Sequence, residues 1–288
     1  MIQKNEKDRL VYLKRKQDKF LLAFINKGGK VNTVTESHAV FSIKEIIKVI
    51  MPMRPIGYEK IRIGPNRDGG YVMLEPGTGG IAYSFGVSPH SPWDLAMAER
   101  GFKVFQYDAS IDSPPDQHPN MQFNKYFVAG SSKAGPYKTV EQIIHENGHN
   151  EENDIIMQMD IEGAEWGVFY TLKTENILKF KQIIVEFHMI GLSINKYTIL
   201  QKIRQTHTPI HIHYVNNIKA CSFLPNQNFI YSDQLIEVTY VRNDNINWGE
   251  YDVFFPTELD APNASTKKKP DIPIGYFDIL AKNWLIDK

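Results

Sequence analysis

Short apolar runs separated by amphipathic stretches dominate the pattern between residues 80 and 245. Each run has the length of a buried strand and is too short for most helices. The runs predict seven strands, at residues 81–87, 103–108, 121–128, 155–159, 182–188, 209–215 and 235–242.

Helical patterns lie between most of these strands. Residues 92–100 follow Ser91, a residue type that favours a helix start, and they end at a glycine. Residues 139–142 form a capping-box pattern that opens another helix. Two further helices are predicted, from the end of the strand at 155–159 to about residue 180, and over residues 193–206. Strands that alternate with helices predict right-handed βαβ crossovers and a mostly parallel sheet.

The two ends of the chain show a different pattern. Residues 10–25 read as an amphipathic helix stopped at Gly28, and residues 42–45 as a capping box for a short helix closed by Pro52. After residue 242 no regular pattern is visible. We therefore expect three parts, namely a helical extension over 1–55, an α/β domain over 56–245 and a wrapping tail over 246–288.

Composition narrows the function classes. The chain has 288 residues, and its 33 Lys and Arg balance its 33 Asp and Glu, so no basic excess predicts nucleic-acid binding. The single cysteine, Cys221, excludes an internal disulfide and a cysteine-based zinc cluster. No apolar run approaches the roughly 20 residues of a membrane span, and the N-terminus lacks the apolar core of a signal peptide. These features predict a soluble cytoplasmic protein. The first thirty residues hold nine Lys and Arg against three Asp and Glu, and their helix could contact an anionic membrane surface, the domain itself or a second subunit in a homodimer.

Acidic residues follow the strand predicted at 155–159. Asp160 and Glu162 come directly after it, at the carboxyl end where open α/β sheets bind their ligands. Such acids can also cap the helix that follows, because negative charge is favourable at a helix N-terminus. On this pattern Asp160 and Glu162 could either form a ligand-binding site at this edge of the sheet or cap the following helix.

The loop after the strand at 81–87 predicts a cofactor without phosphates. Gly86 permits a close backbone approach, and Asp108 follows 22 residues later, near the spacing of an acid that binds a ribose diol. The loop is not a GxGxxG motif, which argues against a pyrophosphate on the next helix. S-adenosylmethionine has a ribose and no phosphates, and it fits this pattern. Asp108 could alternatively be an ordinary turn residue.

At this point the chain resembles the FkbM-type S-adenosylmethionine-dependent methyltransferases. The resemblance is carried by YSFGVSPHSPWDLAMAERGFKVFQYDAS, MDIEGAEW, IIVEFH, IHIHYVNN and EVTYVR, preceded by RIGPNRDGGYVML, and it runs from residue 62 to residue 263. It implies a Rossmann-like class I methyltransferase fold, and methyl transfer to a hydroxyl of a sugar or related small molecule. The loop after Gly86 departs from the Gly-Ala-Asn turn of better-known members.

The resemblance also implies roles for individual residues. Those expected to bind the cofactor are Ser84 and Gly86 at its methionine–ribose part, Asp108 at the ribose hydroxyls, and Asp68, Gly69 and Gly70 at its amino-acid end. Asp160 and Glu162 match an acidic pair at the boundary between cofactor and substrate.

A sugar hydroxyl needs a base or a metal ion to become nucleophilic near neutral pH. His188 ends the strand at 182–188 and is the preferred base, with Glu186 or Asp160 orienting it. A divalent ion held by Asp160, Glu186 and a histidine is the competing device. His211 and His213 point to one side of their own strand, where we expect a polar surface.

Two other functions stay open on the sequence. The chain could be a metal-dependent glycosyltransferase, in which Asp160 and Glu162 hold a cation on a nucleotide-sugar. It could also be a methyltransferase-like binding protein without turnover. The leading expectation is an O-methyltransferase acting on a nucleotide-activated or polysaccharide-linked sugar.

Overall fold

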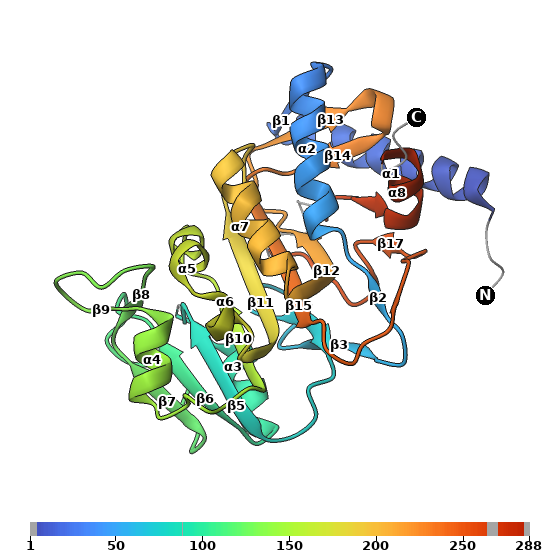
Figure 1. Ribbon diagram of the computed structural model, residues 1–288. Helices are drawn as coiled ribbons and strands as arrows, with labels where there is room; N and C mark the ends of the chain where they lie inside the picture. The colour runs from blue at the N-terminus through green and yellow to red at the C-terminus, as the bar shows by residue number, and fades with distance from the viewer. Residues whose placement is uncertain (1–4, 88, 264–269, 285–288) are drawn as a thin grey trace.

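A seven-stranded sheet forms the centre of the computed structural model, which describes residues 5–87, 89–263 and 270–284 (Figure 1). In spatial order its strands are β12 (His207–Tyr214), β15 (Leu235–Arg242), β11 (Phe180–His188), β10 (Ile155–Met159), β5 (Gly80–Phe85), β6 (Phe102–Tyr107) and β7 (Met121–Asn124).

Strand direction confirms the expected fold class. The pairs from β11 through β10, β5 and β6 to β7 are all parallel, and β15 alone runs antiparallel, between β11 and β12. The chain order reverses between β5 and β10, which creates the crevice where such sheets bind ligands. This is a Rossmann-like, mostly parallel seven-stranded sheet.

Helices cover both faces of the sheet. One face carries α3 (Pro92–Glu99) and the hairpin of β3 (Lys60–Ile63) and β4 (Tyr71–Leu74). The other carries α2 (Ser37–Ile50), α4 (Val140–Glu146), α5 (Glu165–Thr171) and α7 (Ile194–Arg204). Alternate residues of β10 pack on opposite faces of the sheet. Met157 belongs to the larger of the two hydrophobic cores, and Ile156 belongs to the smaller one. Because β10 is buried on both faces, its sequence is a continuous apolar run.

Several predicted boundaries differ from the observed ones. The strand expected at 121–128 ends at Asn124, and residues 127–128 form β8 (Phe127–Val128), which pairs with β9 (Tyr137–Lys138). The helix expected to reach residue 180 is split into α5 and α6 (Thr174–Ile177), because the backbone of Leu172 is not helical and has a ψ of 120°.

The capping predictions have mixed outcomes. The box at Thr139 and Gln142 is confirmed at the start of α4. The box at residues 42–45 is wrong, because α2 already begins at Ser37 and the Ser42 hydroxyl bonds the carbonyl of His38 within the helix. Ser91 precedes α3 but donates to Asp116 instead of capping the helix.

The two ends of the chain pack together beside the sheet. After α1 (Glu6–Asn26), strand β1 (Lys30–Thr33) pairs with β13 (Ala220–Leu224), which continues through η1 (Pro225–Gln227) to β14 (Phe229–Tyr231). The tail expected to be irregular also contains short elements, which are too brief to show a pattern in the sequence. They are β16 (Trp248–Gly249), paired with β2 (Arg54–Pro55), β17 (Phe254–Phe255), paired with β18 (Gly275–Tyr276), and α8 (Phe277–Trp284).

In the described part of the chain, no helix combines the length and the apolar character needed to cross a bilayer.

Candidate active site

A cavity of about 610 Å³ opens at the carboxyl ends of β5, β10 and β11. Most residues expected at the site line it, namely Asp68, Gly69, Ser84, Gly86, Asp160, Glu162, Glu186 and His188. They come from four separate segments of the chain, and the crevice at the reversal of strand order brings them together.

Gly86 directly follows β5 and lies against Asp160, the residue that directly follows β10. Its φ is +88°, and a Cβ at this position would overlap the carbonyl oxygen of Asp160. The backbone N–H of Asp160 donates to the carbonyl of Phe85 at 2.8 Å, which holds the two strand ends together. A glycine is therefore required here by backbone conformation and by the closeness of Asp160.

Asp108 and Gly70 lie just outside the described lining of the cavity. Oδ2 of Asp108 accepts the backbone N–H of Val87 at 2.9 Å, and Oδ1 accepts the backbone N–H and hydroxyl of Ser110. Asp108, which directly follows β6, thus fixes the position of the loop that follows β5. Gly70 packs against Pro65 so closely that a Cβ would overlap its carbonyl oxygen, so this glycine shapes the β3–β4 turn.

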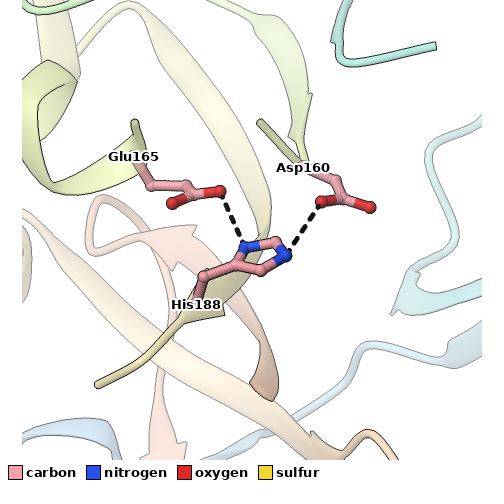
Figure 2. A group of neighbouring side chains, drawn as sticks. All are labelled: Asp160, Glu165 and His188. Atoms are coloured by element: carbon pink, nitrogen blue, oxygen red, sulfur yellow. Dashed lines mark hydrogen bonds and ion pairs between the residues drawn. The ribbon is translucent and has the colours of Figure 1, made fainter. Parts of the chain in front are cut away.

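His188 is held between carboxylates, as Figure 2 shows. Its Nδ1 lies 3.0 Å from Oε1 of Glu165, a side chain with no exposed surface. The same oxygen accepts the backbone N–H groups of Ile161 and Gly163, at 3.0 and 3.2 Å. Because Oε1 of Glu165 is the acceptor for both backbone N–H groups, Nδ1 of His188 is assigned as the donor in this pair. Nε2 is then the nitrogen available for chemistry.

Nε2 of His188 faces three further carboxylates. It lies 3.3 Å from Glu162, 3.7 Å from Asp160 and 3.9 Å from Glu186. Oδ1 of Asp160 is buried and has no hydrogen-bond partner among the described residues. Glu162 adopts the left-handed backbone, with φ +57°, which is strained for a residue with a side chain. Such strain is common at functional sites, and here it places Glu162 at the rim.

The carboxylates and the imidazole shift one another's protonation. Burial raises the pKa of Asp160 to about 7, and it raises the pKa of Glu186 well above its usual range, with Asp160 and Glu237 adding to the effect on Glu186. Burial alone would lower the pKa of His188, but the hydrogen bond and charge of Glu165 outweigh it, and the net shift is upward. All three pKa values are thus shifted upward, and that of Asp160 lies near neutral pH, the range in which general bases operate.

Trp166 fixes the backbone beneath His188. Its indole N–H donates to the carbonyl of His188 at 2.7 Å, and its ring stacks on Phe187 with centroids 4.6 Å apart. The segment that carries His188 is thus anchored from α5, the same helix that supplies Glu165.

A chain of hydrogen bonds links three residues that line the cavity, Ser84, Gln158 and Tyr71. The hydroxyl of Ser84 donates to Gln158 at 3.2 Å, and Gln158 donates to the hydroxyl of Tyr71 at 3.3 Å. On the side of α3, Gln106 donates to Asp94 at 2.6 Å, and burial raises the pKa of Asp94 to about 6. Ser84 is therefore linked through Gln158 to the β3–β4 hairpin.

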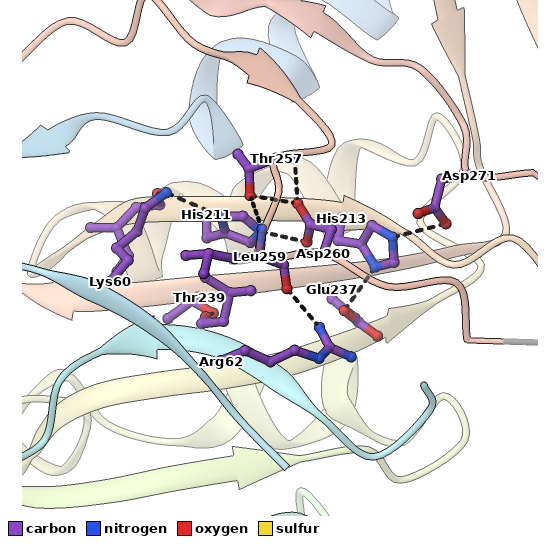
Figure 3. A network of polar contacts seen from close by, with 12 residues as sticks. Lys60, Arg62, His211, His213, Glu237, Thr239, Thr257, Leu259, Asp260 and Asp271 are labelled. Carbon is purple, nitrogen blue, oxygen red and sulfur yellow. Dashed lines mark hydrogen bonds and ion pairs between the residues drawn. The ribbon is translucent and has the colours of Figure 1, made fainter. Parts of the chain in front are cut away.

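His211 and His213 are buried, contrary to the expectation of a polar surface (Figure 3). His211 lies 3.2 Å from Nζ of Lys60 and 2.7 Å from Asp260, and His213 lies between Glu237 and Asp271. Both acids Asp260 and Asp271 come from the C-terminal segment, which the local pattern around the histidines cannot reveal. These pairs fix that segment against β12.

The same network reaches the cavity through Asn263. Its amide nitrogen donates to Glu237 at 2.6 Å and to Asp68 at 3.4 Å, while its amide oxygen is buried without a partner among the described residues. Asn263 therefore joins the C-terminal segment to the β3–β4 loop, and it lines the cavity.

Asp160, Glu165 and His188 carry ligand atoms that lie within 4.8 Å of one another. In the observed geometry, however, Glu165 and Asp160 lie at opposite nitrogens of the imidazole. One ion could bind His188 with only one of them. Nε2 and the neighbouring acids Asp160 and Glu186 match the set of metal ligands expected from the sequence. Glu165 orients the ring through the other nitrogen, Nδ1.

Glu165 and Asn263 were not expected at the site. The Nδ1 partner of His188 is Glu165, whereas the sequence pointed to Asp160 or Glu186. Glu165 lies in the first turn of a helix, where acids are common for other reasons, so its position alone carried no signal. Asn263 lies 195 residues from Asp68 in the chain, and nothing local to either residue indicates their contact.

No protein-family model matches the chain, and no curated protein is significantly similar to it. Solved structures do match, among them that of a protein assigned as an S-adenosylmethionine-dependent methyltransferase from Listeria monocytogenes. The two chains are 7% identical, the match covers 57% of this chain and 91% of the other, and the TM-score is 0.33. A likeness at this level carries no argument about the site, and the resemblance to the FkbM-type enzymes stays a prediction.

Proposed function

We propose that this chain is an S-adenosylmethionine-dependent O-methyltransferase of the FkbM type, acting on a hydroxyl of a nucleotide-activated or polysaccharide-linked sugar. The observation that carries the proposal is the pair of His188 and Glu165. It presents Nε2 to a cavity at the carboxyl ends of the strands, at the reversal of strand order. A general base in that position is what a weakly acidic hydroxyl requires.

The cofactor half of the cavity lies beside β5. Ser84 and Gly86 line it, Asp108 supports its loop, and the turn that contains Asp68, Gly69 and Gly70 covers the opposite end. The first turn of α3 carries the buried acid Asp94 and lacks a glycine-rich loop. An acid at a helix N-terminus opposes a pyrophosphate there, which supports a cofactor without phosphates.

S-adenosylmethionine held by Ser84, Gly86 and the turn at Asp68 would supply the methyl group for the hydroxyl oxygen, with S-adenosylhomocysteine as the leaving group. Nε2 of His188 accepts the hydroxyl proton. Glu165 holds the Nδ1 proton and stabilises the imidazolium that forms. Asp160 and Glu162, close to Nε2, favour the same positive charge.

A divalent ion is the alternative means of activating the acceptor hydroxyl. His188, Asp160 and Glu186 could hold it, and it would lower the pKa of a bound hydroxyl. The unpartnered Oδ1 of Asp160 favours some cation at this point, and the same observation supports the second candidate, a glycosyltransferase that binds a metal and a nucleotide-sugar.

Release of S-adenosylhomocysteine from S-adenosylmethionine in the presence of each of a panel of activated sugars, measured with and without EDTA, tests the proposal. Release that persists in EDTA and is lost in His188→Ala supports a base-catalysed methyltransferase. Release abolished by EDTA and restored by Mg²⁺ or Mn²⁺ assigns the step to the metal. Sugar transfer from a nucleotide-sugar with Mn²⁺, without any S-adenosylhomocysteine, would overturn the methyltransferase assignment. Cofactor binding with no turnover on any hydroxyl acceptor would indicate a binding protein.

A further inference from the structure

Glu186 is a buried acid that lacks a hydrogen bond within the described residues. Its side chain is 8% exposed, it lines the cavity, and its one charged contact is Nε2 of His188 at 3.9 Å. Burying a carboxylate without a partner is costly, so a ligand group that completes this site would be bound strongly.

Glu186 belongs to a row of polar residues that crosses the sheet. It lies directly opposite Glu237 on β15, and Glu237 lies opposite His213 on β12. Directly opposed residues share one face of a sheet, so the three side chains stand next to one another. His213 lies 3.1 Å from Glu237 and serves as its cation. Glu186 has no cation at hydrogen-bond distance in the described chain, because its one charged contact, Nε2 of His188, is 3.9 Å away.

The atoms that surround this end of the cavity mainly accept hydrogen bonds. Besides Glu186, they include the unpartnered oxygens of Asp160 and Asn263. Among the described lining residues Arg67 is the one lysine or arginine, against five acids. A ligand that suits these surroundings brings positive charge and several donors, which describes a protonated amine.

We propose that the acceptor carries a protonated amine beside the hydroxyl that is methylated, and that Glu186 binds this amine. The inference rests on the proposed function and names its substrate class as an amino sugar or another amino alcohol. Nε2 of His188 and Oε1 of Glu186 are 3.9 Å apart, close enough for the hydroxyl and the amine of one 2-amino alcohol.

The same contact directs the methyl group to oxygen. An ammonium group held by a carboxylate keeps its proton and has no lone pair to attack the sulfonium. The hydroxyl at Nε2 of His188 loses its proton to the imidazole and becomes the nucleophile. The amine is thus a recognition group, and the product is the O-methyl ether with the amine unchanged.

Calorimetric titration with matched monosaccharides tests the inference on EDTA-treated protein saturated with S-adenosylhomocysteine. The probes are glucosamine, glucose and N-acetylglucosamine, which differ in the substituent at one carbon, and of which glucosamine alone is charged. Glucosamine is expected to bind at least about tenfold more tightly than either neutral sugar at pH 7, with a preference that shrinks as ionic strength rises. Equal affinities for the three sugars would overturn the inference.

Glu186→Gln keeps the shape of the side chain and removes its charge. It is expected to abolish the preference for glucosamine over the two neutral sugars. Glu151→Gln is the matched control, because Glu151 is an exposed acid before β10, at the opposite end of the strand from the cavity. A preference that survives Glu186→Gln, or displacement of glucosamine by Mn²⁺ alone, would contradict the assignment. S-adenosylhomocysteine is titrated separately, so a failure of the proposed function is seen apart from a failure of the amine site.

Discussion

Nδ1 of His188 and Oε1 of Glu165 are 3.0 Å apart, and Glu165 has no exposed surface. The two residues come from different elements, the end of β11 and the first turn of α5. Because Glu165 also accepts two backbone N–H groups, its orientation is fixed, and it fixes that of the imidazole. The chemistry of the site therefore depends on a buried acid that does not itself face the cavity.

Removal of the imidazole should separate binding from turnover. His188→Ala is expected to lower methyl transfer by about 10²- to 10⁴-fold, the usual contribution of a general base, with unchanged affinity for S-adenosylhomocysteine. Calorimetry gives the affinity, and single-turnover release of S-adenosylhomocysteine gives the rate. Turnover at the normal rate would remove His188 from the mechanism.

The rate should depend on pH through the same imidazole. Glu165 holds the pKa of His188 above its ordinary value, so the base is protonated at low pH and the rate rises as the pH passes through that raised pKa. In Glu165→Gln the charge is lost, the pKa of His188 falls, and the rising limb moves to lower pH. A purely structural role for Glu165 would lower the rate without moving the limb.

Gly86 should tolerate no side chain. In Gly86→Ala the positive φ costs about 1–2 kcal/mol, and the overlap with the Asp160 carbonyl adds about 1–3 kcal/mol. Gly77 is the control, since its φ is +76° and a Cβ would meet nothing within 4 Å. Denaturant unfolding should show a loss for Gly77→Ala near the lower figure and a clearly larger loss for Gly86→Ala. Equal losses would mean that the contact with Asp160 is not tight.

His207 should make stability depend on pH. Burial lowers the pKa of His207 from 6.5 to about 4, so between these pH values His207 is neutral in the folded chain and protonated in the unfolded chain. The contribution of neutral His207 to the free energy of unfolding is fully present above pH 6.5. It is lost as the pH falls towards 4, and the loss is about 3 kcal/mol at most. The difference in unfolding free energy between the wild type and His207→Gln should shrink over that range. A difference that is constant with pH would show that His207 is not buried as the neutral form.

The sequence predicts those parts of the fold that depend on local pattern. Strand β10 was placed at its observed bounds because it is buried on both faces and reads as one apolar run. Its parallel neighbours followed from the alternation with helices. Strand β13 was missed, because its pairing with β1 links segments about 190 residues apart and leaves no periodicity in either. Strand β14, which pairs with β13, was missed with it.

The same distinction holds for the site. Asp160, Glu186 and His188 were found because they interrupt or end apolar strands, where charge has no structural use. Glu165 stands where a helix start would have an acid anyway, and Asn263 reaches the cavity only through the fold of the C-terminal segment. Local sequence shows where chemistry is unusual, but it does not show which distant groups surround it.

Titration of EDTA-treated protein with S-adenosylhomocysteine tests the central claim most directly. The account predicts binding of one molecule per chain without added metal, at equal affinity in the wild type and in His188→Ala. Absence of binding, together with binding of a sugar nucleotide that requires Mn²⁺, would contradict it.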